Sequence, residues 1–511
     1  MIVKKQTVNF CRRGYIPPGL NLALAFIAVL FLWKPPSGMT VQAPNRGTSP
    51  IPASGEASLL AHGESAYHSG RLDLARHYLE EAIRLAPQSA RAHALLGLTM
   101  ARQKDFKEAL ANLRQAHEYD PANGDYAFDY AVLLLQDGRF AAAIPVLEDL
   151  HRKSPQSGDV LVNLARADAG AAQFQKLSAL VSALPAVDYH DAALLKTLAT
   201  VLAGTKQTST LEKLWRSAIK NDPTGPLAYA ALAGIWTTQD KAIKALALLD
   251  GAPAAARGPV YLYARGKTLL ALGRYDEASQ SFRGITVQIP QNEQAWHEMI
   301  WAEVLANHLR KADAEAGEAA KKFSQVTEFR YQQAVVNYML GRTTIAIDAL
   351  TRILQKGGVK DPRPVLLMAV LESQTGNYES AVSYFARLPQ LESGCDALAS
   401  YFYGSTLLRM HRPDAAAIQL QAAIRCRLRF ALAEYRLGQA LTDSGKLREA
   451  LTVLEQATQD DPSLAEPYYA LAQLRRRLGD NAGAEAAIAR FNSVHQHVKN
   501  SDQELLRNGL Q

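Results

Sequence analysis

The sequence predicts an all-α fold, a solenoid of about thirteen helix-turn-helix repeats. The first observation behind this prediction is a period of 34 residues, which separates Pro87, Pro121 and Pro155. The second is the composition, which is rich in Ala, has only 8% aromatic residues and lacks the runs of Val, Ile and Thr that are typical of strands. A fixed period of this length indicates a repeat architecture, in which each unit contacts only its neighbours.

One small or aliphatic residue recurs in every period and marks the units. With slips of one residue, its series counts thirteen units between about residue 56 and residue 491. The members are Gly63, Gly97, Ala131, Ala165, Ala199, Ala233, Gly266, Ile300, Ala334, Ala369, Gly404, Gly438 and Ala472.

Each unit is predicted to contain two helices. The first carries Leu and other aliphatic residues at helical spacing. A turn follows, where Gly suits a helix end that needs a positive φ. The second helix carries a small Ala that lets the two helices approach closely, and Pro then ends it because Pro cannot continue the hydrogen-bond ladder. The turn glycines are Gly70, Gly138, Gly273, Gly341, Gly376, Gly445 and Gly479.

The stretch from Leu96 to Pro121 carries this pattern in full, with Gly97, Ala109 and Ala116 at its small positions. It resembles the tetratricopeptide repeat, and the resemblance covers about 85% of the chain. The family implies a right-handed superhelix in which positions 2, 5, 6, 9 and 12 of each first helix point into a concave groove. Residues 156–257 and 291–395 depart from the pattern; Tyr189 stands where one unit should end in Pro, and Gly357-Gly358 where another should.

The groove that the resemblance implies has an aromatic column at position 5 in the second half of the chain. In the first half, position 5 is Ala94, Phe128, Val162, Lys196 and Ala230. A ladder of rings suits an extended peptide, because rings give contact area at low entropy cost. The alternative is that Tyr is simply the usual residue of the repeat. The predicted peptide-binding residues are Tyr263, Lys267, His297, Trp301, Tyr331, Tyr401, Tyr435, Arg436, Gln439 and Tyr469.

No catalytic motif stands out, so we expect neither an enzyme nor a bound cofactor. The sequence has no HExxH, CxxC, GxGxxG or GxSxG pattern. His297-Glu298 is the one pair that suggests a metal ligand set, and we expect it to line the groove instead. The family's clamp for carboxylate tails needs Lys and Asn in three successive units, and Asn163 alone occupies one such position.

The cysteines allow one disulfide. In repeat coordinates, Cys395 comes just before the first helix of a unit and Cys426 ends the second helix of the same unit. Both fall at the same end of one helical hairpin, so they could pair in an oxidising compartment. The alternative is two unrelated thiols in apolar helices.

The N-terminal segment holds most of the positive charge. Of the net charge of +7, six units lie in residues 1–50, which contain no acid, so the other 461 residues carry about +1. We therefore expect no nucleic-acid partner. Residues 1–33 end in an apolar run, Leu20–Trp33, that fits a signal peptide or a membrane anchor. Residues 34–55 read as a Pro-, Gly- and Ser-rich linker, 56–491 as the solenoid and 492–511 as a C-terminal capping helix.

These features predict a non-enzymatic scaffold that binds other proteins or peptides in its groove. Basic residues before the apolar run should keep the N-terminus in the cytoplasm. The repeats would then face the periplasm, either attached to the cytoplasmic membrane or secreted. The alternative function is a periplasmic adaptor for the assembly or secretion of a cell-surface polymer.

Overall fold

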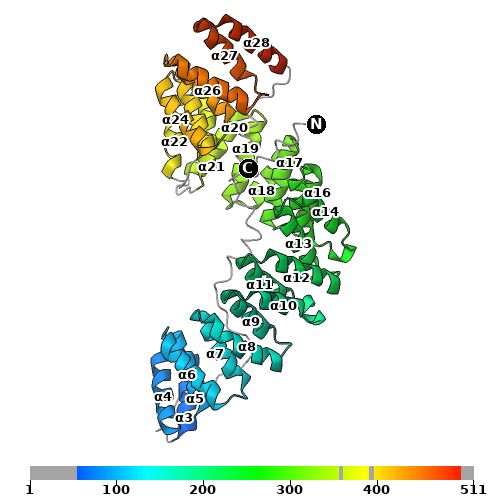
Figure 1. Ribbon diagram of the computed structural model, residues 1–511, viewed down its shortest axis with the longest axis vertical. Coiled ribbons are helices and arrows are strands. Elements are labelled where there is room, and N and C mark those ends of the chain that lie inside the picture. The colour runs from blue at the N-terminus through cyan, green and yellow to red at the C-terminus, as the bar shows by residue number, and fades with distance from the viewer. Residues whose placement is uncertain (1–54, 356–360, 391–395, 496–511) are drawn as a thin grey trace. The chain divides into compact units, whose positions relative to one another are not determined.

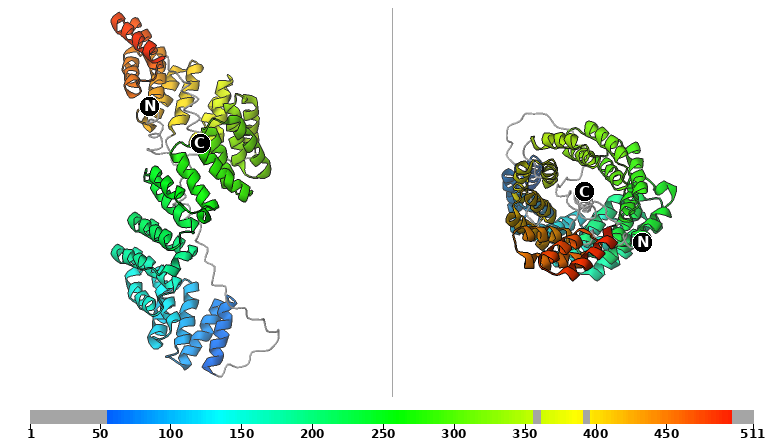
Figure 2. Two further views of the ribbon diagram at one scale, coloured as in Figure 1. Left: turned by 90° about the vertical axis from the view of Figure 1, so that its right-hand side faces the viewer. Right: turned by 90° about the horizontal axis from the view of Figure 1, so that it is seen from above.

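The computed structural model describes residues 55–355, 361–390 and 396–495. These residues contain 26 α-helices and no β-strand. Consecutive helices pack in antiparallel pairs, and the pairs stack on one another (Figures 1 and 2). The chain divides into two compact units, Met1–Leu272 and Gly273–Gln511, and each is described by itself.

The described part of the first unit holds thirteen of the helices. They are α3 (Glu56–His68), α4 (Leu72–Leu85), α5 (Ala90–Arg102), α6 (Phe106–Tyr119), α7 (Gly124–Gln136), α8 (Phe140–Lys153), α9 (Gly158–Gly170), α10 (Phe174–Ser182), α11 (Ala192–Gly204), α12 (Thr208–Asn221), α13 (Pro226–Thr238), α14 (Ala242–Asp250) and α15 (Pro259–Ala271).

The described part of the second unit holds the other thirteen. They are α16 (Tyr275–Gln288), α17 (Glu293–Leu305), α18 (Leu309–Lys322), α19 (Thr327–Met339), α20 (Thr343–Gln355), α21 (Pro362–Gln374), α22 (Tyr378–Phe385), α23 (Ala397–Arg409), α24 (Pro413–Cys426), α25 (Ala431–Asp443), α26 (Leu447–Asp460), α27 (Glu466–Arg477) and α28 (Asn481–His495).

The turn inside each hairpin confirms the predicted repeat. All seven predicted turn glycines have a positive φ. In the other six units a non-glycine residue adopts the same conformation: Lys104, Ala172, Lys206, Asp240, Asn307 and His411. The residue that follows donates its backbone N–H to a carbonyl five residues back, as Arg71 does to Ala66 at 2.9 Å and Asp105 to Met100 at 2.9 Å. This is the geometry of a helix end closed by a left-handed residue.

Close helix approach explains the small residue of the first helix. A Cβ added at Gly97 would lie 2.7 Å from Cγ of Leu113, which is fully buried on α6. Gly404 and Leu420 repeat this contact in the second unit, with a distance of 2.6 Å. The paired helices therefore pack in the same way in both units, and their core is built from these small residues and the Leu and Ala residues opposite.

Three second helices are shorter than the others, and they fall in the regions where the sequence departs from the repeat pattern. Helices α10, α14 and α22 have nine, nine and eight residues, against fourteen in α4. Each is followed by a short 3₁₀ turn: Ala186–His190, Ala254–Ala256 and Leu388–Gln390. Tyr189, in the first of these turns, is only 5% exposed and packs in the core where a regular unit would have Pro.

Several predictions fall outside the described residues. They concern residues 1–54, Gly357-Gly358 and residues 496–511. Of the predicted capping helix, only residues 492–495 are described, and they lie at the end of α28. Among the described helices, none is long and apolar enough to cross a membrane.

Candidate functional site

The candidate site consists of positions 2, 5, 6, 9 and 12 of each first helix, called the groove positions from here on. First helices contact one another along each unit: α3 with α5, α5 with α7 and α7 with α9 in the first, and α21 with α23, α23 with α25 and α25 with α27 in the second. Where first helices contact one another, their groove positions follow one another along the unit.

Three aromatic residues at groove positions of the second unit are buried. Tyr331 is 1% exposed, Trp301 is 5% exposed and Tyr401 is 0% exposed. All three belong to the unit's main hydrophobic cluster, and the ring of Tyr401 lies 5.3 Å from that of Phe430. These three rings therefore contribute to the core of the second unit.

Next to the Tyr331 ring, charged side chains connect three first helices, α17, α19 and α21. Arg363 on α21 donates to Oε2 of Glu328 on α19 at 2.7 Å and to Asp361 at 2.8 Å, and its guanidinium lies 5.0 Å from the centre of the Tyr331 ring. Nε2 of His297 on α17 lies 3.3 Å from Oε1 of Glu328. Burial by itself would raise the pKa of Glu328, but the hydrogen bond with His297 and the charge of Arg363 hold it below its ordinary value.

The same Nε2 atom of His297 also lies 3.0 Å from Nε1 of Trp301, so it is in contact with both the indole and the Glu328 carboxylate. His297 thus has an acidic contact in Glu328, one repeat away along the chain. Among the described residues, no group of three His, Cys, Asp or Glu side chains is placed to hold a metal ion.

The column becomes more accessible toward the C-terminus. On α25, Gln439 donates to Oη of Tyr435 at 2.8 Å and accepts from Arg436 at 3.1 Å, so the three side chains form one half-buried polar group. Tyr469 on α27 is 48% exposed, with its ring 5.4 Å from that of Phe491. Of the predicted groove residues in the second unit, these four and the half-buried His297 are the accessible ones.

The remaining two predicted groove residues lie in the first unit. Tyr263 and Lys267 are half-buried on α15. The ten predicted residues are thus divided between the units, two in the first and eight in the second.

Several groove positions of the first unit are partly accessible. On α5, α7 and α9 five of the larger apolar side chains at these positions are half-buried, whereas Ala94 at position 5 of α5 is 4% exposed. The five are Leu95, Leu98, Phe128, Val132 and Val162. Position 9 of α13 is Gly234, and a Cβ there would meet no atom within 4 Å. Asn163, the one residue that matched the carboxylate clamp, donates its amide to the carbonyl of Asp159 in its own helix at 2.9 Å.

Acidic side chains share these positions, and sequence reasoning missed them. Asp125 and Asp129 occupy positions 2 and 6 of α7, and Asp159 occupies position 2 of α9. Burial, followed by the charge of Asp125, raises the pKa of Asp129 to about 6. The spacing of four residues between Asp125 and Asp129 places them on one helix face, which is the signal that could have revealed them.

A second buried charge network holds the second unit together away from the column. Glu303 on α17 is 0% exposed and bonds to Ser279 and Lys311, to His308 at 3.0 Å and to Arg283 at 3.2 Å. Burial would raise the pKa of this carboxyl, but the hydrogen bonds from Lys311, Ser279 and His308 lower it. The network joins α16, α17 and α18, so we interpret it as structural.

Cys426 ends α24 and is disulfide-bonded. Cys395, its predicted partner, lies outside the described residues. The pairing of these two cysteines therefore stays a prediction.

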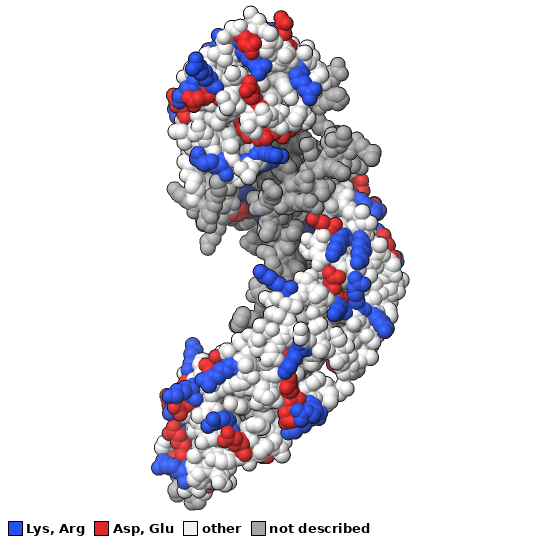
Figure 3. All heavy atoms as spheres, viewed as in Figure 1, with Lys and Arg blue, Asp and Glu red and all other residues white. Residues whose placement is uncertain are grey.

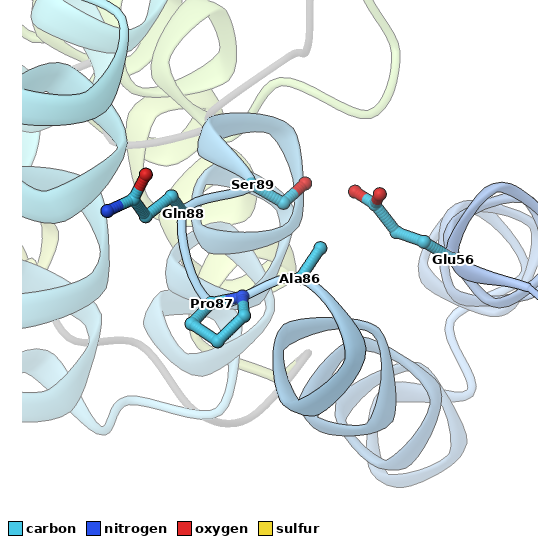
Figure 4. Close-up of a pocket in the computed structure, with 5 residues that line it drawn as sticks. All are labelled: Glu56, Ala86, Pro87, Gln88 and Ser89. Carbon is cyan, nitrogen blue, oxygen red and sulfur yellow. The ribbon is translucent and has the colours of Figure 1, made fainter.

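Two surface features suggest no chemistry. A shallow hollow is lined by Glu56, Ala86, Pro87, Gln88 and Ser89, with the Glu56 carboxylate and the Ser89 hydroxyl turned toward each other (Figure 4). On the face that Figure 3 shows, basic and acidic side chains are interspersed instead of gathering by sign.

Comparison with known protein families agrees with this architecture. Tetratricopeptide repeat families match residues 60–116 and 101–158, residues 134–202 and residues 260–285, and a family described as TPR repeat matches residues 438–479. The chain is a tetratricopeptide repeat protein. Tetratricopeptide repeats serve as scaffolds for protein–protein interaction, and this fold is typically non-enzymatic. None of the curated proteins matches the sequence.

Solved structures of other repeat proteins resemble this one in part. The APC/C hetero-tetramer Cut9–Hcn1 is 14% identical over 90% of this chain and 97% of that chain, with a TM-score of 0.37. MamA from Desulfovibrio magneticus RS-1 is 21% identical over 33% of this chain and 95% of that chain, with a TM-score of 0.31. Naa15/Naa10 bound to HypK-THB is 17% identical over 85% and 68% of the two chains, with a TM-score of 0.33. At these TM-scores the likenesses add nothing about function.

Proposed function

We propose that this tetratricopeptide repeat protein is a scaffold that holds partner proteins on the outer side of the cytoplasmic membrane. Its partners' peptide segments would bind at the groove positions of α25 and α27. The observation that carries the proposal is the accessible group of Tyr435, Arg436, Gln439 and Tyr469, because rings next to polar donors are typical of peptide-binding surfaces.

The location rests on the sequence of residues 1–33. Their basic residues, followed by the apolar run, support attachment to the membrane or export across it. Fractionation of cells that express the chain, combined with protease treatment of spheroplasts, tests this part. We expect the repeats to fractionate with membranes or periplasm and to be cleaved from outside. Recovery of an intact chain in the cytosol would contradict it.

A double substitution tests the binding surface. In the Tyr435→Ala, Tyr469→Ala chain, we expect cross-linked partners recovered from membranes to fall about tenfold, a loss of about 1.4 kcal/mol in binding. Tyr119→Ala is the matched control, since Tyr119 is 42% exposed but lies on the second helix α6, away from the groove positions. Equal recovery with the double variant and the wild type would refute the assignment.

A further inference from the structure

The groove positions of α5, α7 and α9 in the first unit form a surface that the predicted peptide-binding residues do not include. Its apolar part consists of the half-buried side chains Leu95, Leu98, Phe128, Val132 and Val162. Three carboxylates, Asp125, Asp129 and Asp159, share the surface. We call these eight residues the acidic groove.

Two of the carboxylates have a structural explanation within their own helices. Asp125 and Asp159 lie in the first turns of α7 and α9, where a negative charge interacts favourably with the helix dipole. Asp129 has no such explanation, because it lies in the middle of α7. Its main electrostatic neighbour is Asp125, which has the same sign, and burial raises its pKa further, to about 6. Asp129 is therefore a partly desolvated acid next to another acid.

The basic side chains at nearby groove positions do not neutralise this charge. Arg91 on α5 pairs with Glu64 on α3, with 2.6 Å between Nη2 and Oε2. Arg166 on α9 is exposed to solvent. A cation brought by a ligand would relieve the like-charge repulsion between Asp125 and Asp129, and the apolar side chains beside them would add contact area.

We propose that the acidic groove binds a protein segment in which Lys or Arg side chains stand beside apolar ones, with one cation facing Asp129. This inference rests on the proposed scaffold function and names the chemistry of one class of partner. The acidic groove carries negative charge, whereas a clamp for carboxylate tails carries positive charge. The absence of the Lys and Asn set agrees with this difference, and so does the hydrogen bond of the Asn163 amide within α9. Phosphate-rich partners are disfavoured, because the carboxylates would repel them.

Peptide binding to the full chain tests the proposal. The probes are two fluorescent twelve-residue peptides, one with alternating Leu and Lys and the other with Glu in place of every Lys. By fluorescence anisotropy, we expect the Lys peptide to bind at least tenfold more tightly than the Glu peptide. Asp129→Asn keeps the shape of the side chain and should weaken binding of the Lys peptide about five- to tenfold.

The control variant is Asp137→Asn. This substitution removes the same charge from the C-terminal end of the same helix. Asp137 is not at a groove position, and its carboxylate pairs with Arg139 at 2.6 Å. We expect its affinity for the Lys peptide to stay within twofold of the wild type. Circular dichroism of both variants checks that the helices are retained.

Three outcomes would overturn the proposal. One is equal binding of the two peptides by the wild type, and another is equal weakening by Asp129→Asn and Asp137→Asn. The third concerns the chain's own basic segment: if replacing Lys4, Lys5, Arg12 and Arg13 by Ser tightens binding of the Lys peptide tenfold, that segment is the occupant and not an external partner. Failure here is distinguishable from failure of the proposed function, whose variants, Tyr435→Ala and Tyr469→Ala, lie in the second unit.

Discussion

Position 5 of the repeat is occupied by Phe128 in the first unit and by Tyr401 in the second, and the two rings have different environments. Phe128 is half-buried, whereas Tyr401 is 0% exposed. Position 9 shows the same contrast, because a Cβ at Gly234 would meet open space while Val335 is 1% exposed. One backbone frame thus supports two kinds of surface, and the side chains placed on it decide whether groove positions are accessible or join the core.

The contrast extends to charge. Around Arg363 the second unit pairs its groove charges within the chain, whereas in the first unit burial and the like charge of Asp125 raise the pKa of Asp129. A surface whose charges are already paired gains less from a charged ligand than one whose charges repel. The groove positions of the first unit are therefore better placed to select a partner by charge.

The largest expected effect comes from truncating the two position-5 rings. Tyr401→Ala should lower the free energy of local unfolding around α23 by about 3–4 kcal/mol, because it opens a cavity in a packed cluster. Phe128→Ala should cost α7 less, about 1–2 kcal/mol, since that ring is only partly buried against the core of the first unit. Hydrogen exchange followed by mass spectrometry measures both, helix by helix. Equal costs would remove the contrast between the units.

The next effect concerns two arginines at position 2. Arg363→Ala should destabilise the α19–α21 region by about 2 kcal/mol, because it leaves the mostly buried Glu328 carboxylate without its cation. Arg91→Ala should cost less than about 1 kcal/mol, since Arg91 is 59% exposed and Glu64 is 36% exposed. Urea-dependent hydrogen exchange of the two regions gives both values. A larger loss in the first unit would reverse the comparison.

Acidification should act on the two units in opposite directions through their groove acids. The pKa of Asp129 is raised, so the folded state binds its proton more tightly and its contribution to stability falls as the pH rises from about 4 to about 6. The pKa of Glu328 is lowered, so its contribution is present above its ordinary range and is lost as the pH falls.

Asp129→Asn tests this prediction, because the amide does not titrate. At pH 7 we expect the variant to be more stable than the wild type by about 1 kcal/mol, after discounting for solvent screening, and the difference should vanish below about pH 4. Hydrogen exchange of α7 at pH 4 and pH 7 measures it. A difference that grows on acidification would contradict the assigned sign.

The smallest expected effect is a gain in stability. Gly234 lies inside α13, where Gly costs about 0.5–1 kcal/mol relative to Ala, and its Cβ would meet no atom. Gly234→Ala should therefore stabilise α13 by that amount, visible as slower exchange of its amides. The control is Gly97→Ala, which should destabilise α5, because its Cβ would lie 2.7 Å from Leu113.

The sequence was sufficient to predict the repeat, its register and its turns, because Gly, Ala and Pro act through local geometry that recurs in every unit. All seven predicted turn glycines have a positive φ. The six non-glycine residues in the same conformation can be located only by their position in the repeat, because neither Lys nor His favours a positive φ. The shortened α10, α14 and α22 were visible only as departures from the pattern.

The burial of the individual groove positions was not predictable in the same way. Helical periodicity tells which face Tyr331 and Tyr401 occupy, but their burial depends on the volume of side chains one and two repeats away. The pair of Arg363 and Glu328 spans 35 residues, and no local pattern joins them. The binding role of the accessible residues and the location of the chain stay predictions.

The turn inside each hairpin has a consequence for how the chain tolerates changes in length. In every unit, the left-handed turn residue comes seven positions after the small residue of the first helix, as Asn307 does after Ile300. The irregular spacings fall between units, with 33 residues from Asp240 to Gly273 and 35 from Gly376 to His411. Differences in repeat length are thus located in the connections between hairpins. We therefore expect that a whole hairpin can be duplicated, removed or exchanged at these connections.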